Sequence, residues 1–558
     1  MLHQVKSRTP SIFKFINQCY AKPSCLFYGE NIILSQTGAQ QGDPTGPLLF
    51  SLTLQNIVSS LSSELNVWYL DDGTLGGTPS SVFNDLNKLI EESSKIGLEL
   101  NPTKCEIFYC AGNIDPLFQV EIENVLPGIR IKSDCDLELL GAPLLEEGCI
   151  PSFTQRFEDM KRMFGRLKQL NSHVAYFLLK NCFNIPKMTY VLRTSPMWKF
   201  PDYLNEIDRE IKSTLESLLN LKLNDSQWDQ TTLPIKYGGI GIRKASDICL
   251  PAFLSSANSV KPLMSDILNV NEAQLVIGHL NSALSTWENK YSVEPDTKNI
   301  QKFWDEIVIK QVVEQKMNFT ESVDIARFKA VQAEGAGTWL DAVPSKQVGT
   351  LIESRAFRIC IGLRLGCTLV RSHPCICGVA SVDEKGLHSL SCQKSVGRFS
   401  RHASLNNVLK RALGAGGIPC QLEPVGLTRD VNLRPDGISI VPWENGKHLI
   451  WDATCTDTLA PSNLQYSVRE SGLCAENACR KKHEKYAMLE ENYEFVGFAV
   501  ETFGVICKEG LGLLKKIGKL LIDKTGNVRA GKYLRQIVGV EVQRGNAACV
   551  IGACPISG

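Results

Sequence analysis

Two adjacent carboxylates, Asp71 and Asp72, lie in the segment YLDDGTLGG, which runs from Tyr69 to Gly77. The Asp-Gly step and the apolar residues before it predict a β-hairpin with both acids at its tip. Carboxylate oxygens held together on a rigid tip are ligands that suit Mg²⁺. An Asp-Gly step alone also explains a tight turn, so these nine residues leave a turn and a metal site open.

A second pair of carboxylates lies in the last third of the chain, in the segment RPDGISIVPWENGKHLIWDATC. This segment predicts two strands joined by a turn at 444–446, with Asp436 opening the first strand and Asp452 inside the second. A charged Asp among apolar residues is costly to bury unless a cation or hydrogen bonds compensate it. We therefore expect a bound cation or hydrogen bonds at Asp452, and a hairpin can bring the carboxylates of Asp436 and Asp452 within reach of one metal.

Two lysines follow on the predicted helix ENACRKKHEKYAMLEENY. Lys482 and Lys485 are three residues apart and so share a helix face, from which one of them would supply positive charge to a phosphate. The alternative is a solvated helix face, which is what most runs of charge are. A later basic stretch offers further phosphate contacts. It consists of Lys515, Lys516, Lys519, Lys524, Arg529, Lys532 and Arg535.

A cysteine and histidine array precedes these acids in HPCICGVASVDEKGLHSLSC. Cys375, Cys377, His388 and Cys392 form a C-x-C-x₁₀-H-x₃-C pattern, and three thiolates with one imidazole suit a closed, tetrahedral Zn²⁺ site. His373 is the alternative nitrogen ligand. With twenty cysteines in the chain, a set of buried cysteines beside an unrelated histidine is the competing interpretation.

The elements around the first acids are a loop and a helix in GAQQGDPTGPLLFSLTLQNIVSSL. In the loop, Gln41 supplies an amide and Gly42 lets the backbone come close to a ligand. The helix is predicted to bury one apolar stripe. That stripe consists of Leu48, Leu49, Leu52, Ile57 and Leu61. The first twenty residues read as one amphipathic helix.

Taken in order, these segments resemble the palm of reverse transcriptases of non-LTR retrotransposons. The resemblance rests on QGDPxxPxLF followed by Y-x-D-D-G, then on IGLELNPTKCEIF, which contains Lys104, and on LLGAPLLEEGC, which is similar to the hairpin that grips the primer. It implies that Asp71 and Asp72 hold catalytic Mg²⁺ during nucleotide addition. It also implies that Gln41, Gly42 and Lys104 bind nucleotide or template.

The resemblance also indicates a missing part. In the family another catalytic Asp stands on a strand before the QGDP loop, followed by a connector similar to PSIFKFINQCYAKPSCLFYG at Pro10–Gly29. We therefore expect that strand and the fingers to lie upstream of Met1. Asp43 lies in the loop and is no substitute. We expect the chain alone not to extend a primer.

The later motifs resemble a PD-(D/E)xK nuclease core. Where D-x-K is usual this chain has Asp452-Ala453-Thr454, so the lysine would come from the helix as Lys482 or Lys485. The same displacement is typical of the endonuclease that follows a CCHC knuckle in site-specific non-LTR retrotransposons. It implies Mg²⁺-dependent hydrolysis of a DNA phosphodiester, with Asp436 and Asp452 as metal ligands.

The composition agrees with a globular, multidomain chain. Of 558 residues 43% are hydrophobic, and 60 Lys and Arg stand against 59 Asp and Glu, so there is no overall basic signal for nucleic acid. Scattered cysteines predict a reducing compartment, and no apolar run is long enough to span a membrane. We expect an intracellular, nuclear protein that contacts DNA and RNA and no membrane; the oligomeric state is left open.

The sequence therefore predicts an α+β multidomain protein. Its parts are a partial reverse transcriptase palm (1–150), a helical thumb (151–257), a helical linker (258–365), a CCHC zinc knuckle (366–398) and an α/β restriction-like endonuclease domain (399–545). The alternatives are a nucleic-acid-binding protein without catalysis, or the product of a pseudogene. Metal-dependent nicking of DNA separates catalysis from binding.

Overall fold

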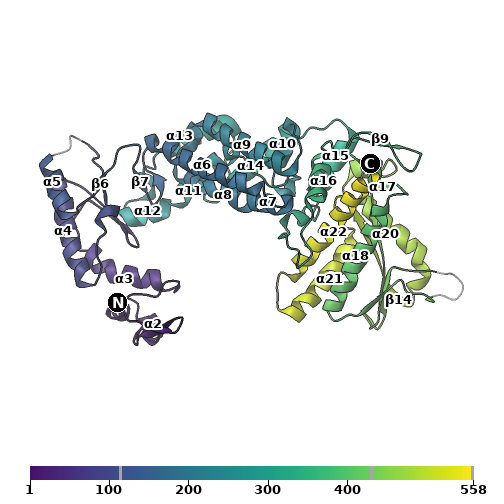
Figure 1. The fold of residues 1–558 in the computed structure, drawn as a ribbon, viewed down its shortest axis with the longest axis horizontal. Coiled ribbons are helices and arrows are strands. Elements are labelled where there is room, and N and C mark those ends of the chain that lie inside the picture. The colour runs from purple at the N-terminus through teal and green to yellow at the C-terminus, as the bar shows by residue number, and fades with distance from the viewer. Residues whose placement is uncertain (112–115, 428–432, 555–558) are drawn as a thin grey trace. The chain divides into compact units, whose positions relative to one another are not determined.

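A computed structural model describes residues 1–111, 116–427 and 433–554 of the chain (Figure 1). The described residues divide into two compact units, Met1–Pro151 and Ser152–Gly558. Both contain helices and strands, so the architecture is mixed α and β, as the sequence predicts. The finer division of the second unit into thumb, linker, knuckle and nuclease stays a prediction.

The first unit is built from short two-stranded sheets and helices. The hairpin with the double Asp consists of β3 (Leu65–Tyr69) and β4 (Asp72–Gly76). Asp85 on α4 (Pro79–Lys95) fixes the chain before β3, because its Oδ2 accepts hydrogen bonds from the amides of Ser62 at 2.7 Å and Ser63 at 2.6 Å. The remaining elements are α1 (Leu2–Arg8), α2 (Pro10–Tyr20), β1 (Ser24–Tyr28), β2 (Asn31–Ser35), α3 (Gly46–Val58), β5 (Glu106–Ile107), α5 (Pro116–Val125), β6 (Arg130–Ile131), β7 (Glu138–Leu139) and β8 (Ala142–Pro143).

Three local predictions in this unit are wrong. The first twenty residues form two helices, because Pro10 lacks an amide hydrogen and begins a new helix. The hairpin turn lies at Leu70 and Asp71, since Tyr69 pairs with Asp72 and Leu70 takes a φ of 60°. The apolar stripe of α3 buries Leu49, Leu54 and Ile57, whereas Leu48 is 42% exposed and Leu61 lies beyond the end of the helix.

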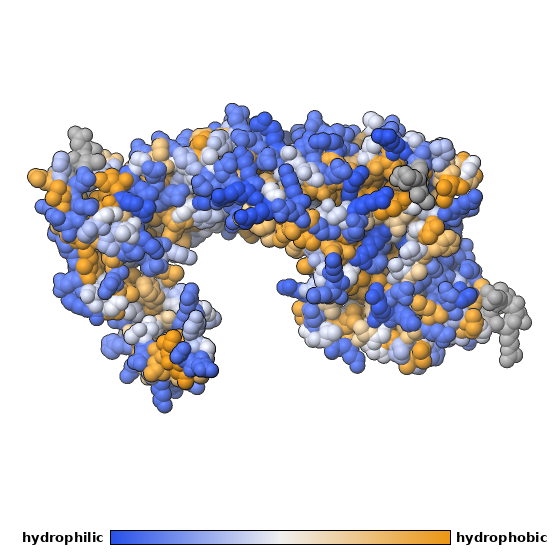
Figure 2. All heavy atoms as spheres, in the orientation of Figure 1, coloured by the Kyte–Doolittle hydropathy of each residue, from blue (hydrophilic) through white to orange (hydrophobic). Residues whose placement is uncertain are grey.

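The β1–β2 hairpin is unusually apolar for an exposed element. Its register pairs Leu26 with Ile33 and Phe27 with Ile32, and all four side chains are exposed. Figure 2 shows hydrophobic atoms gathered over this end of the chain, next to α2. Within the described part of the first unit, the sheet has two strands only.

The second unit begins with helices. Helix α9 (Pro201–Leu219) buries one apolar stripe, which consists of Leu204, Ile207, Ile211, Leu215 and Leu218. The helices before residue 258 are α6 (Cys149–Leu167), α7 (Ser172–Leu178), α8 (Ile185–Thr194), α9, α10 (Asp225–Thr232) and α11 (Ala245–Ser259). They continue as α12 (Lys261–Leu268), α13 (Leu280–Tyr291), α14 (Gln301–Lys316), α15 (Ser322–Gln332) and α16 (Ser354–Leu365).

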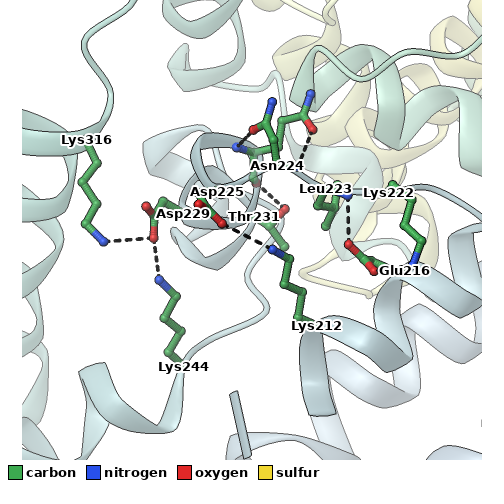
Figure 3. A network of polar contacts seen from close by, with 11 residues as sticks. Lys212, Glu216, Lys222, Leu223, Asn224, Asp225, Asp229, Thr231, Lys244 and Lys316 are labelled. Atoms are coloured by element: carbon green, nitrogen blue, oxygen red, sulfur yellow. Dashed lines mark hydrogen bonds and ion pairs between the residues drawn. The ribbon is translucent and has the colours of Figure 1, made fainter. Parts of the chain in front are cut away.

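A polar network joins several of these helices (Figure 3). Asp229 on α10 accepts from Lys244, which precedes α11, at 2.5 Å and from Lys316 at the end of α14 at 3.2 Å. Asn224 caps α10, and its side chain accepts from the amide of Gln227 at 2.9 Å. The lysines drawn here are therefore used in internal contacts, which weakens any case for this surface as a phosphate-binding one.

The last part of the chain is a four-stranded mixed sheet in the order β11 (Cys420–Leu422), β12 (Gly437–Ser439), β13 (His448–Thr456) and β14 (Tyr493–Glu501). The first three strands are antiparallel, and β13 and β14 are parallel. One face of β13 and β14 packs on α18 (Val396–Ala415), α21 (Lys508–Thr525) and α22 (Ala530–Ala553) (Figure 1). The other face packs against α20 (Leu473–Tyr486).

The sequence features of this region are found where they were predicted. The turn between the two strands falls at Asn445 and Gly446, both with positive φ, and Gly417 with a φ of 91° follows α18. The seven basic residues predicted after residue 514 are all exposed on α21, α22 or the loop between them. Helix α22 continues past residue 545 to Ala553. Among the described residues, no helix combines the length and the apolar character needed to cross a bilayer.

The burial of His173 makes the free energy of unfolding depend on pH. His173 on α7 is fully buried, stacks on Phe357 at 4.5 Å and accepts from the amide of Ile352 at 3.2 Å. Burial, then the charges of Arg544 and Lys180, lower the pKa of His173 from 6.5 to about 4. The unfolded chain therefore binds a proton at this residue between pH 6.5 and about 4 that the folded chain does not.

We expect the free energy of unfolding to fall as the pH falls from 6.5 to 4, by about 3 kcal/mol at most from this residue. His173→Asn keeps a hydrogen-bond acceptor and cannot titrate, so it should flatten this dependence in urea unfolding at a series of pH values. His279→Asn, at an exposed position, is the control and should leave the slope unchanged. Equal slopes for His173→Asn and the parent protein would contradict the assignment.

Candidate active site and metal-binding clusters

Asp452 is the most deeply buried acid of the predicted nuclease site. It lies near the middle of β13, opposite Gly497 of β14, and is 3% exposed. Side chains alternate along a strand, so Trp451 and Ala453 enter the core under α18, while Ile450 and Asp452 face α20. The charge of a buried carboxylate on this face has to be compensated by polar or charged groups from α20.

Helix α20 supplies two such groups. The ammonium group of Lys482 forms an ion pair with Asp452 Oδ1, and the hydroxyl of Tyr486 donates to Asp452 Oδ2 at 2.5 Å. These residues are four apart and therefore share one face of the helix. Burial, then the hydrogen bond to Asp452, raise the pKa of Tyr486, so the phenol stays protonated.

Lys485 contacts the acids only through Tyr486. Its ammonium group donates to the hydroxyl of Tyr486 at 2.8 Å and lies over the same ring, 4.4 Å from the centroid. Of the two lysines the sequence left open, Lys482 is the one that contacts a predicted catalytic acid, and Lys485 supports Tyr486.

Asp436 immediately precedes β12 and is half-buried. Its Oδ2 accepts from the amide of Ala453 at 2.6 Å and from His402 Nε2 at 2.9 Å. Burial acts to raise the pKa of Asp436, but the contacts with His402 and the amide of Ala453 outweigh it and lower the pKa. The hydrogen bond with Asp436 in turn raises the pKa of His402.

The two acids share one environment. Asp436 is held by the amide of the residue next to Asp452, and both carboxylates act electrostatically on His402 and on Tyr486. The Pro-Asp-Gly sequence fits this arrangement, because a Cβ on Gly437 would lie 2.1 Å from the ring of Trp451. That ring is fixed by a 3.0 Å hydrogen bond from Trp451 Nε1 to Asn406 on α18.

Sequence reasoning missed two members of this site, His402 and Tyr486. His402 lies about one turn before Asn406 on α18, and nothing in RFSRHASLNN indicates that this helix crosses the start of β12. Tyr486 had an available signal, because it follows Lys482 by four residues and so had to share its face. The catalytic roles of the whole set stay predictions.

The four residues of the predicted zinc knuckle lie together. One ligand atom from each of Cys375, Cys377, His388 and Cys392 lies within 4.8 Å of all the others. Cys375 Sγ is 3.6 Å from Cys392 Sγ, and Cys377 Sγ is 3.4 Å from His388 Nε2. For bonds of about 2.3 Å to sulfur and 2.1 Å to nitrogen, tetrahedral ligands stand roughly 3.5 to 3.8 Å apart, which these separations approach.

Local structure positions the knuckle ligands. Cys375 follows β9 (His373–Pro374), which pairs with β10 (Ser381–Val382), and Asp383 accepts from the amide of His388 at the start of α17 (His388–Ser391). The backbone amides of Val379 and Ala380 lower the pKa of Cys377 to about 6, which favours a thiolate.

The alternative ligand His373 is excluded by its own contacts. Its two ring nitrogens lie 2.8 Å from the carbonyl oxygens of Arg371 and Ala553. The residue therefore tethers the end of α22 to β9, and both of its ring nitrogens are used in these contacts.

In the first unit the structure places the double Asp at the surface. Asp71 lies in the turn and Asp72 opens β4, and both are exposed. In the described part of the chain neither carboxylate forms a hydrogen bond or an ion pair, and the same holds for the side chains of Gln41 and Lys104. These groups are accessible to ligands, but no contact joins them to one another.

The loop before α3 is held by hydrogen bonds to the side chain of Asp43. Gly42 takes a φ of 89°, which glycine adopts without strain, and Asp43 Oδ1 accepts from the amide of Thr45 at 2.8 Å. Asp43 Oδ2 accepts from the hydroxyl of Tyr20. The carboxylate of Asp43 therefore serves the loop.

Comparison with known proteins identifies part of the first unit. Residues 3–144 match the family model described as Reverse transcriptase (RNA-dependent DNA polymerase). The chain carries a reverse transcriptase domain. It is also 23% identical over 220 residues to the Retrotransposable element SLACS 132 kDa protein of Trypanosoma brucei gambiense, an alignment that covers 38% of this chain and 18% of that protein. The alignment therefore spans only a small part of the length of that relative, and the reverse transcriptase domain implies binding to nucleic acid.

The contact between Lys482 and Asp452 predicts a stability effect. In EDTA, Lys482→Met should lower the free energy of unfolding by about 1–3 kcal/mol, because it leaves a buried carboxylate without its cation. Lys485→Met should cost less than about 0.5 kcal/mol, as at most exposed positions. Chemical denaturation measures both.

A second change separates charge from packing. Asp452→Asn, added to Lys482→Met, removes the uncompensated charge and should recover most of the lost stability. Equal losses in Lys482→Met and in Lys481→Met, a substitution at the exposed neighbouring position, would contradict the ion pair.

Proposed function

We propose that this chain is a retrotransposon-derived protein whose last part is a Mg²⁺-dependent endonuclease that nicks DNA. The observation that carries the proposal is the convergence of Asp436, Asp452 and Lys482 from two strands and a helix onto one site. This set is sufficient in type for metal-dependent hydrolysis of a phosphodiester, because the carboxylates can hold a metal and the lysine supplies a fixed cation for the phosphate.

The donor set fits Mg²⁺. Both candidate ligands are carboxylates, and hard cations of this kind prefer oxygen. Asp452 Oδ1 is buried and accepts no hydrogen bond among the described residues, meeting only the ammonium group of Lys482. When bound, Mg²⁺ would lower the pKa of a coordinated water and neutralise charge on the phosphate.

The residues of this chain then have distinct tasks. Lys482 provides a fixed positive charge that can pass from Asp452 to a phosphate oxygen. Tyr486, held by Lys485, keeps Asp452 in its orientation through the 2.5 Å hydrogen bond. His402 does the same for Asp436. The exposed lysines and arginines of α21 and α22 would bind the DNA backbone.

In the first unit, we propose that Asp71 and Asp72 are Mg²⁺ ligands by their ancestry in an RNA-directed DNA polymerase. Gln41, Gly42 and Lys104 would contact nucleotide or template. The support is the reverse transcriptase match over residues 3–144 and the accessible acids at the hairpin tip. DNA and RNA are then the partners, and a protein that nicks chromosomal DNA would work in the nucleus.

We further propose that Cys375, Cys377, His388 and Cys392 bind one structural Zn²⁺. The support is the approach of four ligand atoms to within 4.8 Å and the burial of Cys375 and Cys392. Such a small region has few apolar residues of its own, and metal binding would supply the energy that orders it.

A second candidate function is nucleic-acid binding without catalysis. The exposed basic residues of α21 and α22 favour it, because they would hold DNA whether or not the acids bind a metal. The nicking experiment separates the two functions.

The nuclease prediction is tested on supercoiled plasmid with purified full-length chain and Mg²⁺. Asp452→Ala and Asp436→Ala should each abolish nicking, and Lys482→Ala should lower its rate by about 10²-fold or more, since a fixed charge at a reacting phosphate is lost. Lys485→Ala should cost less than about tenfold. Lys481→Ala, an exposed position on the same helix, should leave the rate unchanged.

DNA affinity is measured in parallel by fluorescence anisotropy. We expect Asp452→Ala to bind within about twofold of the parent protein at matched salt, because the exposed basic residues of α21 and α22 are unchanged. A parent protein that binds DNA but does not nick it with Mg²⁺ would reject the endonuclease and favour the binding protein.

The zinc prediction is tested on the same chain by elemental analysis after dialysis. Cys375→Ser and Cys392→Ser should each remove one equivalent of zinc and make residues 366–398 sensitive to protease, because metal binding and local folding are coupled. Cys367→Ser, at a buried cysteine that starts this region and is not one of the four ligands, is the control and should keep the metal. No loss of zinc in either variant would overturn the assignment.

A further inference from the structure

A second group of metal-ligating side chains lies on a neighbouring face of α20, the helix that carries Lys482. Cys479 and His483 of α20 and Glu509 in the first turn of α21 each offer one ligand atom, and these atoms lie within 4.8 Å of one another. None of the three belongs to the Asp436–Asp452 site or to the knuckle. We call these three residues the α20–α21 cluster.

The contacts inside the cluster converge on one oxygen. Glu509 Oε2 accepts from Cys479 Sγ at 3.0 Å and lies 2.9 Å from His483 Nε2. The other ring nitrogen, His483 Nδ1, lies 2.6 Å from Glu490 Oε1. A carboxylate on the second nitrogen is the arrangement that orients a metal-bound histidine and increases its basicity.

The backbone makes room for the cluster. A Cβ on Gly497 of β14 would lie 2.9 Å from Cys479 Sγ, so the glycine lets α20 approach the strand closely. The amide of Gly497 also donates to Glu509 Oε2 at 3.0 Å. Cys479 is 6% exposed, whereas His483 and Glu509 are half-buried and reachable by an ion from solvent.

The donor types select the metal. A thiolate, an imidazole and a carboxylate together suit Zn²⁺, while Mg²⁺ and Ca²⁺ prefer sites made only of oxygen. Three protein ligands leave a fourth position open for water. Binding would release the thiol proton of Cys479 and any proton on His483 Nε2, and no electron is transferred.

We propose that Cys479, His483 and Glu509 bind Zn²⁺, as a second zinc site distinct from the knuckle. Residues four apart share a helix face. Cys479 and His483 therefore turn toward Glu509 while Lys482 and Tyr486 turn toward Asp452. The metal ties α20 to the start of α21 and fixes the helix that presents Lys482. The inference rests on the cluster alone, so it stands or falls separately from the nuclease.

The same contacts have an explanation without metal. His483 can be an imidazolium between Glu490 and Glu509, with the thiol of Cys479 donating to Glu509. That arrangement needs no Zn²⁺ and predicts that the chain binds one equivalent at the knuckle only. A metal count therefore decides between the two.

The experiment measures zinc in the purified full-length chain after dialysis against buffer. The parent protein should retain two equivalents, the double variant Cys479→Ser/His483→Ala one, the double variant Cys375→Ser/Cys392→Ser one, and the four changes together none. Cys474→Ser is the matched control, since Cys474 is buried on the same helix outside the cluster, and it should retain two.

Cobalt substitution gives a readout independent of the count. Co²⁺ in the Cys375→Ser/Cys392→Ser variant should still show a thiolate-to-metal charge-transfer band, and Glu509→Gln added to that variant should weaken Co²⁺ binding at least tenfold. Loss of all zinc in Cys375→Ser/Cys392→Ser, or as much zinc in Cys479→Ser/His483→Ala as in the parent protein, would overturn the proposal. Circular dichroism establishes that each variant is folded, and Glu509→Gln, the mildest change, carries the test if the double variant unfolds.

Discussion

The last part of the molecule depends on one carboxylate that the fold keeps out of water. Asp452 sits on β13 between strands on both sides and is 3% exposed, so its charge must be met by the protein. Removing both oxygens from water costs several kcal/mol unless partners replace the lost hydration. The position of α20 follows from this requirement, because Lys482 and Tyr486 are the partners.

Helix α20 can meet that requirement only if it lies close to the sheet. Gly497, directly opposite Asp452 in the parallel pairing, removes the side chain that would hold the helix away. The same closeness brings Cys479 and His483 to Glu509 on the neighbouring face of the helix. One glycine thus sets the spacing for two clusters, and a larger residue there would displace the groups of both.

The sequence predicted the elements of this region well and their contacts less well. The two strands, the turn with Asn445 and Gly446, and the lysine helix follow from alternation and turn chemistry, which are local. Asp452 could be singled out because an acid among apolar residues demands compensation. His402 could not, since its contact with Asp436 depends on where α18 crosses the sheet. Cys479, His483 and Glu509 meet only through tertiary packing, and the last is 26 residues from its histidine.

In the first unit, sequence patterns predicted the hairpin and the helix but misplaced one turn and one buried side chain. The hairpin with Asp71 and Asp72 was predicted, but its turn lies two residues earlier than the Asp-Gly step suggests, because Tyr69 pairs with Asp72. Periodicity placed Leu48 inside, although the described residues leave it exposed. A stripe of apolar residues predicts which face of a helix is suited to burial. The face is buried only where a neighbouring element packs against it.

The β1–β2 hairpin carries a consequence for handling the protein. Six large apolar side chains on it are exposed, and both outer edges of the two-stranded sheet offer unpaired backbone groups among the described residues. An apolar, flat edge of this kind is a template on which a second chain can add a strand. Concentrated solutions of the chain would therefore self-associate through residues 24–35, and a single lysine on each strand would keep them dispersed.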